Sequence, residues 1–341
     1  MLIRAVEKLD DQKNAWTAQV TYRNSWTDDR LVYDDHNGTI RYLTLTETER
    51  LWFPDTFFKN EKESYFHAMP SPNTLVRIYP NGRIMYSTRL TLTLQCPMIL
   101  TAFPADKQVC GITLASCKFH LKKNFLATFA NFFHLDAHTV DDIMYVWKEG
   151  SPIQVSANLW IPLFTMEKYL TSYCSSTTNT GSYSCLEVAF LFRRQVSHYL
   201  LTLYIPLAMF VLVSWVTFWI NPKTDFTSRT VLSLGALLGA AALIAHANQA
   251  TAPVSYCRLV DTYTGVCLAF IFAAILESAT VNYTLKQATN SLSAAVTMSG
   301  ESKQNKLVAL MRSGKLDRIA RIAFPVAFLL FVIVYSCVTF T

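Results

Sequence analysis

The sequence predicts an all-β, Ig-like sandwich over residues 1–198, followed by a bundle of four membrane-spanning helices over residues 199–341. Three observations predict this fold: the first part alternates apolar and polar residues, the second contains long apolar runs, and only 16% of the 341 residues are charged. Soluble domains carry about 25% charged residues. The low charge and the small net charge of +6 exclude a soluble cytosolic enzyme, a disordered protein and a nucleic-acid-binding protein.

Strands account for the first part. Trp16–Tyr22 and Arg83–Leu94 alternate apolar and polar residues with a period of two, and Thr74–Tyr79 is rich in β-forming residues. No secretory signal precedes them, so we expect residue 1 to be a mature or trimmed terminus. Turn-forming clusters separate the strands, at Asp34–Gly38, Pro70–Asn73 and Pro80–Gly82. Regularly punctuated strands of this kind are typical of a sandwich.

Four apolar runs predict helices at residues 199–220, 230–247, 259–283 and 319–340. About 20 residues rising about 1.5 Å each span a hydrocarbon core of about 30 Å. The loop 284–318 carries six Lys or Arg residues against two acidic ones, which places it in the cytoplasm. The β domain is therefore expected outside the cell, on a multi-pass protein of the plasma membrane. Residues 288–305 are expected to form a flexible linker.

Cysteine spacing supports an extracellular location for the β domain. Cys96 and Cys110 bracket one short loop and Cys174 and Cys185 another, which favours two disulfides in an oxidising space, with free cysteines as the alternative. Asn37 begins an N-glycosylation tripeptide on a turn.

Several local strings resemble one family. The loop between Cys96 and Cys110 contains Phe103-Pro104-Ala105-Asp106, and the other matching strings are Trp52–Asp55, Arg194-Gln195, Pro206 and Pro253–Tyr256. With four apolar runs, the whole chain resembles subunits of the Cys-loop pentameric ligand-gated ion channels. The string Thr178–Cys185 is most similar to invertebrate glutamate-gated chloride channels, as are Met1–Arg4 and Pro54–Phe58.

The resemblance implies a ring of five identical or different subunits, with a glutamate-like agonist bound between neighbouring β domains. It places Arg4, Arg23 and Ser87 on the complementary face, and Ser116, Thr180 and Tyr183 on the principal face, with Phe57 in an aromatic wall. Guanidinium groups bind carboxylates in bidentate fashion, and an ammonium group prefers aromatic faces, so this set suits an amino acid. The alternative is that Arg4 and Arg23 form surface ion pairs and Tyr183 is a plain hairpin aromatic.

The second apolar run is expected to surround the ion path. Val231, Gly235, Leu238, Ala242 and His246 recur at spacings of four, three, four and four, and five Leu238 side chains would form an apolar gate. A ring of Arg229 side chains and the positive helix N-terminus favour anions, chloride first. Asp225 is the counter-argument, and cation selectivity is the alternative. His246 is expected to be an ordinary exposed histidine, although it could titrate near neutral pH.

Two further expectations concern charged residues at the membrane interface and inside a membrane span. Arg194 is a charge partner for Asp106, in a contact that would couple agonist binding to gating. Glu277 lies inside the third run, so it should face protein or water.

The chain departs from the family near the site. Cys117 follows Ser116 where the family has an aromatic residue, and a cysteine cannot form the same cation–π contact. Phe119, two residues later and on the same strand face as Cys117, could substitute. An insertion between Cys117 and Trp147 has apolar residues at helical spacing, at Phe125, Leu126, Phe129, Phe132 and Phe133. We expect a short amphipathic helix, packed on the protein or acting as a lid. His134, Asp136 and His138 could share a face and hold a metal, which is the less favoured interpretation.

These observations predict an agonist-gated channel whose partners are a glutamate-like agonist, a permeant ion (chloride favoured), membrane lipids and other subunits, with no cofactor, resident metal or nucleic acid. The alternatives are a receptor with another agonist or with cation selectivity, a non-conducting assembly or binding subunit, and a membrane enzyme using the cluster at residues 134–138.

Overall fold

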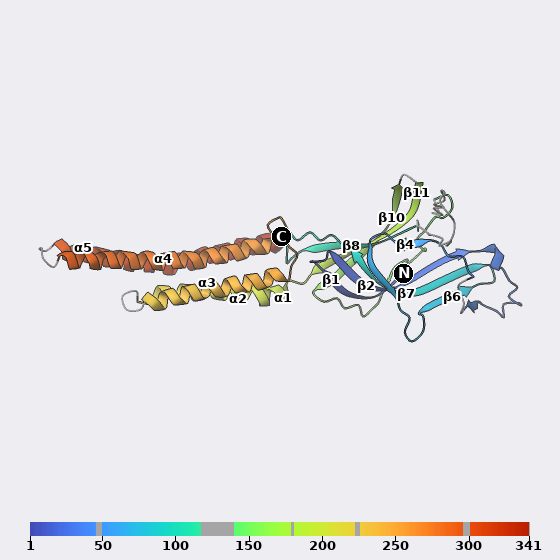
Figure 1. The fold of residues 1–341 in the computed structure, drawn as a ribbon, viewed down its shortest axis with the longest axis horizontal. Helices are drawn as coiled ribbons and strands as arrows, with labels where there is room; N and C mark the ends of the chain where they lie inside the picture. Colours follow the sequence, from blue (N-terminus) through green and yellow to red (C-terminus); the bar gives the residue numbers. More distant parts are fainter. Residues whose placement is uncertain (46–49, 117–139, 179–180, 222–225, 296–300, 341) are drawn as a thin grey trace, which may run out of the picture. The chain divides into compact units, whose positions relative to one another are not determined.

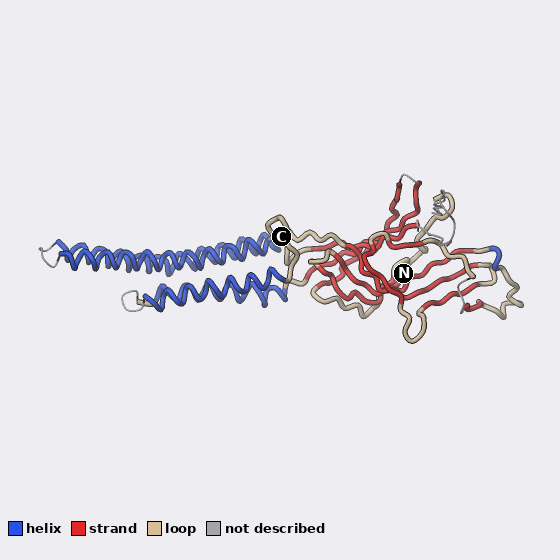
Figure 2. The backbone as a smooth tube through the Cα atoms, in the orientation of Figure 1, coloured by secondary structure: helices blue, strands red, loops and turns tan. Residues whose placement is uncertain are grey.

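The computed structural model describes residues 1–45, 50–116, 140–178, 181–221, 226–295 and 301–340. The chain divides into two compact units, and each is built from segments that are separate in sequence. The β unit comprises Met1–Met98 and Lys107–Arg193, and the helical unit comprises Ile99–Asp106 and Arg194–Thr341. The main segment of the helical unit therefore begins at Arg194, five residues before the expected start at residue 199, and the unit also includes a segment from the cysteine loop. Figure 2 shows strands confined to one part of the chain and long helices to the other.

Two antiparallel sheets build the β unit (Figure 1). Among the described residues, the seven-stranded sheet contains β1 (Leu2–Asp10), β2 (Ala15–Thr27), β3 (Leu43–Leu45), β5 (Glu61–Phe66), β6 (Thr74–Ile78), β7 (Arg83–Gln95) and β9 (Gln154–Val155). Within the described ranges, only the short β9 pairs in parallel, with β1. The four-stranded sheet contains β4 (Thr56–Phe58), β8 (Lys107–Ser116), β10 (Phe164–Thr178) and β11 (Gly181–Arg194). A single turn of 3-10 helix, η1, covers Asp29–Leu31.

The core of the β unit follows from the alternation of β2. Trp16, Ala18 and Val20 are buried, and the residues between them turn to the opposite face of the sheet. The Trp16 ring lies 5.5 Å from the ring of Phe190 and 5.6 Å from that of Phe192, both on β11 of the other sheet. The two sheets thus pack face to face, and the predicted sandwich is confirmed.

Glycine is required at one of the predicted turns. Gly82 has a φ of +73°, and a Cβ atom there would lie 2.6 Å from the carbonyl oxygen of Asp28. That oxygen belongs to the turn that ends β2, so the β6–β7 turn packs directly on the end of β2.

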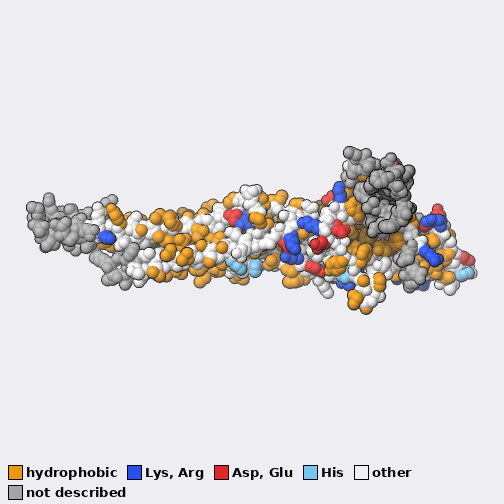
Figure 3. Space-filling model, viewed as in Figure 1, with side chains coloured by type: hydrophobic (Ala, Val, Ile, Leu, Met, Phe, Trp, Pro, Cys, Tyr) orange, Lys and Arg blue, Asp and Glu red, His pale blue; other side chains and the backbone are white. Residues whose placement is uncertain are grey.

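The helical unit contains four apolar spans. The first combines α1 (Ser197–Tyr199), the π-helical η2 (Leu200–Tyr204), α2 (Ile205–Val216) and η3 (Thr217–Trp219), and the others lie in α3 (Phe226–Gln249), α4 (Leu259–Ala295) and α5 (Glu301–Phe340). Each of the four is long and apolar enough to cross a membrane. Figure 3 shows mainly hydrophobic and uncharged side chains over the visible face of these helices.

The predicted flexible linker is wrong in its conformation. Helix α4 continues to Ala295 and α5 already begins at Glu301, so most of residues 288–305 are helical. The helices at residues 230–247, 259–283 and 319–340 are also longer than expected. The segment contains three Ala residues, which have the highest helix propensity, and no Pro, and polar composition alone does not stop a helix.

Candidate functional site

The outer face of the seven-stranded sheet brings together three of the predicted binding residues. Arg23 on β2 lies directly opposite Ser87 on β7. Two residues earlier on β2, Thr21 accepts a hydrogen bond of 2.7 Å from Nε of Arg4 on β1. Arg4 and Arg23 are both exposed. Since residues opposite one another in an antiparallel pair share a face, the two guanidinium groups and the Ser87 hydroxyl lie on one surface.

A third arginine on this face was not expected from the sequence. Arg89 lies opposite Thr21, and its Nη2 atom donates to Oε1 of Gln19 at 2.7 Å. The available signal was its position two residues after Ser87, which places both on the same face of β7. The face therefore carries three guanidinium groups beside the Glu7 carboxylate, which accepts from Nε2 of Gln19, and the guanidinium groups suit a carboxylate ligand.

The expected principal-face residues lie on the other sheet. Phe57 on β4 pairs with Ala115 on β8 and is half-buried. Tyr183 on β11 is only 3% exposed. The principal and complementary residues of one chain thus occupy different sheets, and Thr180 lies outside the described residues.

Ser116 has a partner inside the β unit. The side chain is fully buried, and its hydroxyl donates to Oδ1 of Asp55 at 2.9 Å. Ser116 ends β8, and its hydrogen bond ties that strand to the residue preceding β4.

Several expectations fall outside the described residues. These are Cys117 and Phe119, the apolar positions Phe125, Leu126, Phe129, Phe132 and Phe133, the cluster of His134, Asp136 and His138, and Asp225. Asn37, the candidate glycosylation site, lies on an exposed turn.

Both cysteine pairs of the β unit are joined. Disulfides link Cys96 to Cys110 and Cys174 to Cys185. The second closes the hairpin of β10 and β11 next to Tyr183.

Asp106 and Arg194 form a buried ion pair in the helical unit. Nε of Arg194 donates to Oδ1 of Asp106 at 2.7 Å and Nη2 to Oδ2 at 3.2 Å. The two side chains are each 2% exposed, and the guanidinium also lies over the ring of Phe103, 4.9 Å from its centroid. The expected charge pairing is thus present, and its role in coupling stays a prediction.

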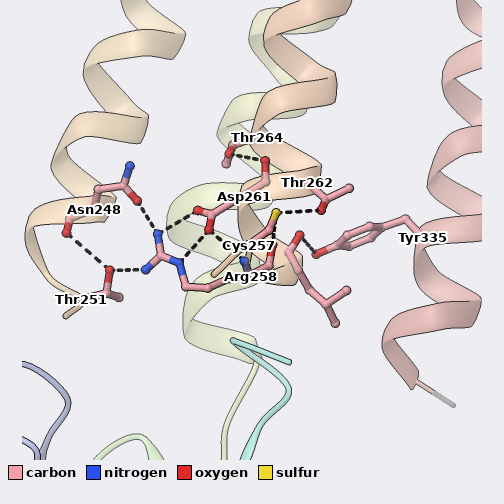
Figure 4. Close-up of polar contacts among 9 residues, drawn as sticks. Asn248, Thr251, Cys257, Arg258, Asp261, Thr262, Thr264 and Tyr335 are labelled. Atoms are coloured by element: carbon pink, nitrogen blue, oxygen red, sulfur yellow. Dashed lines mark hydrogen bonds and ion pairs between the residues drawn. The ribbon is translucent and has the colours of Figure 1, made fainter. Parts of the chain in front are cut away.

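A second buried arginine, Arg258, lies at the C-terminal end of α3. Arg258 donates from Nε and Nη2 to the carboxylate of Asp261 at 2.9 and 2.8 Å (Figure 4). Its remaining N–H groups reach Oγ1 of Thr251 at 2.6 Å and Oδ1 of Asn248 at 2.9 Å. The hydrogen bond with Asp261 raises the pKa of Arg258. This arginine therefore joins the last turn of α3 to the first turn of α4.

The cysteine-loop segment contacts the α3–α4 linker within the helical unit. The backbone N–H of Leu100 donates to the Tyr256 hydroxyl at 2.8 Å, and that of Leu259 donates to the Thr101 carbonyl at 3.0 Å. The Phe103 ring lies near both buried arginines, because the Arg258 guanidinium is 5.9 Å from its centroid.

Helix α3 exposes the predicted ion-path face. Val231 and Leu238 are each 64% exposed, and Gly235, Ala242 and His246 are exposed as well. The opposite face, at Ser233, Ala236 and Ala240, is buried against the rest of the unit.

The expected ring of Arg229 side chains is wrong. Arg229 has no exposed surface, and its Nη2 atom pairs with Asp317 of α5 at 2.9 Å and with Glu277 of α4 at 3.3 Å. The side chain therefore points into the bundle and away from the exposed face of α3. The expectation that Glu277 faces protein is confirmed by the same contact.

Comparisons with known proteins agree with this architecture. The model of the neurotransmitter-gated ion-channel ligand binding domain matches residues 1–196, and that of the neurotransmitter-gated ion-channel transmembrane region matches residues 203–312. The chain is 44% identical over 290 residues to a glutamate-gated chloride channel of Drosophila melanogaster, and 36% identical over 289 residues to a glutamate-gated chloride channel subunit beta of Haemonchus contortus. The matches cover 85% and 83% of this chain, which spans 59% and 62% of the relatives' own length.

The ligand-binding model matches the part of the chain that contains the β unit, and the transmembrane model matches the helices that follow. The first match alone covers more than half of the chain. The β unit is the ligand-binding domain, and the four spans make the chain a multi-pass protein of the plasma membrane. The chain belongs to the family of neurotransmitter-gated ion channels.

Proposed function

We propose that the chain is a subunit of a pentameric, glutamate-gated anion channel. The observation that carries the proposal is the juxtaposition of Arg4, Arg23 and Ser87 on one face of the seven-stranded sheet. The two relatives named above are glutamate-gated chloride channels.

The chemistry of this face suits a dicarboxylic amino acid. Two guanidinium groups provide charge-assisted donors for two carboxylates, and a serine hydroxyl adds a neutral donor. Phe57 and Tyr183 supply aromatic faces for the ammonium group, and Thr180 a further hydroxyl. Because the arginines and the aromatic residues of one chain occupy different sheets, a complete site requires a neighbouring subunit.

The permeant ion is proposed to be chloride. Helix α3 contains no Asp or Glu, so it brings no acidic ring to the path along its length. Its N-terminus carries a partial positive charge, which favours anions at that end. Since Arg229 is ion-paired inside the bundle, the anion preference rests on these two features and not on an arginine ring.

Gating is proposed to act at Leu238. Its exposed side chain would form an apolar constriction in a ring of five, and such constrictions close by dewetting. Agonist held by the β10–β11 hairpin would favour the open state, because the agonist binds the open state more tightly than the closed state. The pair of Asp106 and Arg194 would carry that change into the helical unit.

The proposal is tested by recording from oocytes that express the chain alone. We expect glutamate to evoke a current whose reversal potential shifts when external chloride is lowered. Arg23→Ala should raise the half-maximal glutamate concentration roughly 10- to 100-fold, since a charge-assisted hydrogen bond contributes about 1.5–3 kcal/mol.

Arg83→Ala is the matched control, because Arg83 lies on the same sheet, exposed over the ring of Tyr79. An unchanged response of Arg23→Ala, or activation by glycine or an amine in place of glutamate, would contradict the assigned agonist. A sodium-dependent reversal potential would contradict the assigned ion. A chain that reaches the surface and carries no current would support a non-conducting subunit.

A further inference from the structure

Part of the segment between β8 and β9 is held against the β10–β11 hairpin. We call this part, residues 140–147, the strap. The backbone N–H of Val140 donates to the Ser182 carbonyl of β11 at 3.0 Å. At the other end of the strap, Nε1 of Trp147 donates to the Ser172 carbonyl of β10 at 3.1 Å. The strap is therefore hydrogen-bonded to both strands of the hairpin.

Tyr145 lies within the strap and has two partners on the four-stranded sheet. Its backbone N–H donates to Oγ of Ser184 on β11 at 2.7 Å. Its hydroxyl shares a hydrogen bond of 2.7 Å with Oγ1 of Thr56 on β4. Both partners adjoin residues of the proposed site, because Ser184 follows Tyr183 and Thr56 precedes Phe57. One residue thus joins the two strands that carry the aromatic side chains.

β8 separates these two strands, and it ends close to Tyr145. The order of the sheet is β10, β11, β8, β4, so β11 and β4 lie two strand spacings apart, about 9.6 Å. Ser116, the last residue of β8, pairs with Thr56. Within the described residues, β8 provides no connection beyond Ser116. The two hydrogen bonds of Tyr145 bridge β11 and β4 at this end of the sheet.

The partners of Tyr145 project on the face opposite to the aromatic residues. Phe57 and Cys185 lie opposite one another across β8, and Tyr183, two residues before Cys185, shares their face. Successive side chains of a strand point to opposite faces, so Thr56 and Ser184 project on the other one. Tyr145 therefore fixes the backbone behind the aromatic residues and does not occupy the face that they present.

Burial keeps the Tyr145 hydroxyl protonated. Burial raises the pKa of Tyr145 well above its usual range, against a smaller opposing effect of the hydrogen bond with Thr56. The hydroxyl therefore keeps its proton, and with it this hydrogen bond, throughout the physiological pH range.

We propose that Tyr145 is a positioning residue of the agonist site, whose two hydrogen bonds set the distance between Phe57 and Tyr183. An ammonium group needs both aromatic faces at the right separation. A link that holds the two strands in place before the agonist arrives lowers the ordering cost of binding. The inference deepens the proposed function and rests on it.

The test is the glutamate response of Tyr145→Phe, which keeps the ring and removes the hydroxyl. Loss of one hydrogen bond should raise the half-maximal glutamate concentration about fivefold. The current should also decay several-fold faster after glutamate is removed, since affinity differences lie mostly in the dissociation rate. Surface expression and maximal current should stay unchanged. A merely structural role would lower expression and leave both the half-maximal concentration and the decay unchanged.

Two variants of Thr56 form a matched pair. Thr56→Val removes the hydroxyl at nearly the same volume, and it should reproduce the response of Tyr145→Phe. Thr56→Ser keeps a hydroxyl at the same position, and it should respond like the unmodified chain. An equal loss in both variants would show that the hydroxyl at this position is not what matters.

A double variant tests whether the two ends act through Tyr145. Thr56→Val and Ser184→Ala each break one end of the link, and their side chains lie on strands that are not neighbours. Changes this far apart with no shared partner are additive, which would give about 25-fold for the pair. We expect about fivefold, as in either single variant, because a link broken at one end is already lost.

Tyr33→Phe is the control for the loss of a tyrosine hydroxyl elsewhere in the β unit. The Tyr33 hydroxyl donates to the Ile78 carbonyl at 3.1 Å, on the other sheet. This variant should leave the half-maximal glutamate concentration unchanged.

Three results overturn the inference while the proposed function stands: an unchanged half-maximal concentration in Tyr145→Phe, an equal rise in Tyr33→Phe, and multiplied effects in the double variant. An unmodified chain that reaches the surface and ignores glutamate rejects the proposed function, and the positioning role with it. Should Tyr145→Phe not reach the surface, the comparison of Thr56→Val with Thr56→Ser decides, by the same two quantities.

Discussion

Arg23 and Arg229 are both arginines expected to meet an anion, and the structure gives them opposite environments. Arg23 is exposed on a sheet face beside Ser87, whereas Arg229 has no exposed surface and lies between Asp317 and Glu277. A guanidinium group that loses its water needs counter-charges, and these then determine its contacts. Exposure, more than residue type, therefore decides which arginine is accessible to a ligand.

The largest expected effect comes from neutralising the two arginines separately. Arg229→Gln leaves two carboxylates buried without their cation, at a cost of about 3–5 kcal/mol. We expect few channels at the surface, measured by surface biotinylation. Arg23→Gln should reach the surface normally and fail only in its response to glutamate. Normal surface expression of Arg229→Gln would show that the buried ion pairs of Arg229 are not needed for folding.

A triple variant tests whether the loss of Arg229 acts through unpaired buried charges. Combining Arg229→Gln with Glu277→Gln and Asp317→Asn removes all three buried charges together. Since apolar or neutral replacement of a whole buried ion-pair network is often tolerated, surface expression should recover in part. Expression no better than that of Arg229→Gln would point to a role for Arg229 other than pairing.

The pair of Asp106 and Arg194 extends the comparison to a second buried arginine. Asp106→Asn or Arg194→Gln should each cost about 3 kcal/mol and reduce agonist-evoked current. Exchanging the two residues restores the opposite charges, but not the contact of the guanidinium with the Phe103 ring. Partial recovery of the maximal current is therefore expected, and no recovery would count against a coupling role.

Substitution of two glycines tests which face of α3 is exposed and which is buried, with no change of charge. A Cβ atom on Gly239 would lie 2.6 Å from the Phe210 ring, whereas one on Gly235 meets nothing within 4 Å. Gly239→Ala should therefore cost about 1–3 kcal/mol and lower the melting temperature of the purified chain. Gly235→Ala should leave the melting temperature unchanged or slightly higher. Equal effects of the two changes would contradict the assigned faces.

The smallest effect belongs to an exposed ion pair. Lys8 and Asp10 are 2.8 Å apart at the end of β1. Burial acts to raise the pKa of Asp10, but hydrogen bonds from the Lys8 side chain and the Lys13 and Gln12 backbone outweigh it and lower the pKa.

The stabilisation from a lowered carboxyl pKa is present above the unfolded value and is lost as the pH falls through the folded value. With solvent screening, we expect no more than about 0.5 kcal/mol. The change should appear in acid denaturation followed by tryptophan fluorescence, and Asp10→Asn should remove it. A loss as large as that of Arg229→Gln would erase the distinction between exposed and buried pairs.

Much of the fold was predictable because its signals are local. The alternation in residues 16–22 and 83–94 marks β2 and β7, and runs without charge mark the spans. The exposed face of α3 also followed from spacing alone. Helix geometry also disfavours an Arg229 ring. Each residue of an α-helix turns by about 100°, so Arg229 lies roughly 200° around the helix from Val231, away from the exposed face.

Other features depend on contacts distant in sequence. The pairing of Arg229 with Glu277 and Asp317 joins residues 48 and 88 positions apart. The hydrogen bond of Ser116 to Asp55 and the addition of Ile99–Asp106 to the helical unit are equally non-local. Local pattern cannot show such partners, since it reports only which face of an element is apolar.

The passage of the chain between the two units has a practical consequence for hybrid receptors. The polypeptide crosses at Met98–Ile99, at Asp106–Lys107 and at Arg193–Arg194, so no single splice point separates the ligand-binding part from the helices. A chimaera joined only at residue 194 would combine a foreign segment 99–106 with this chain's helices. Transplanting that octapeptide together with the helices keeps Asp106 with its own Arg194, and should yield the better assembled receptor.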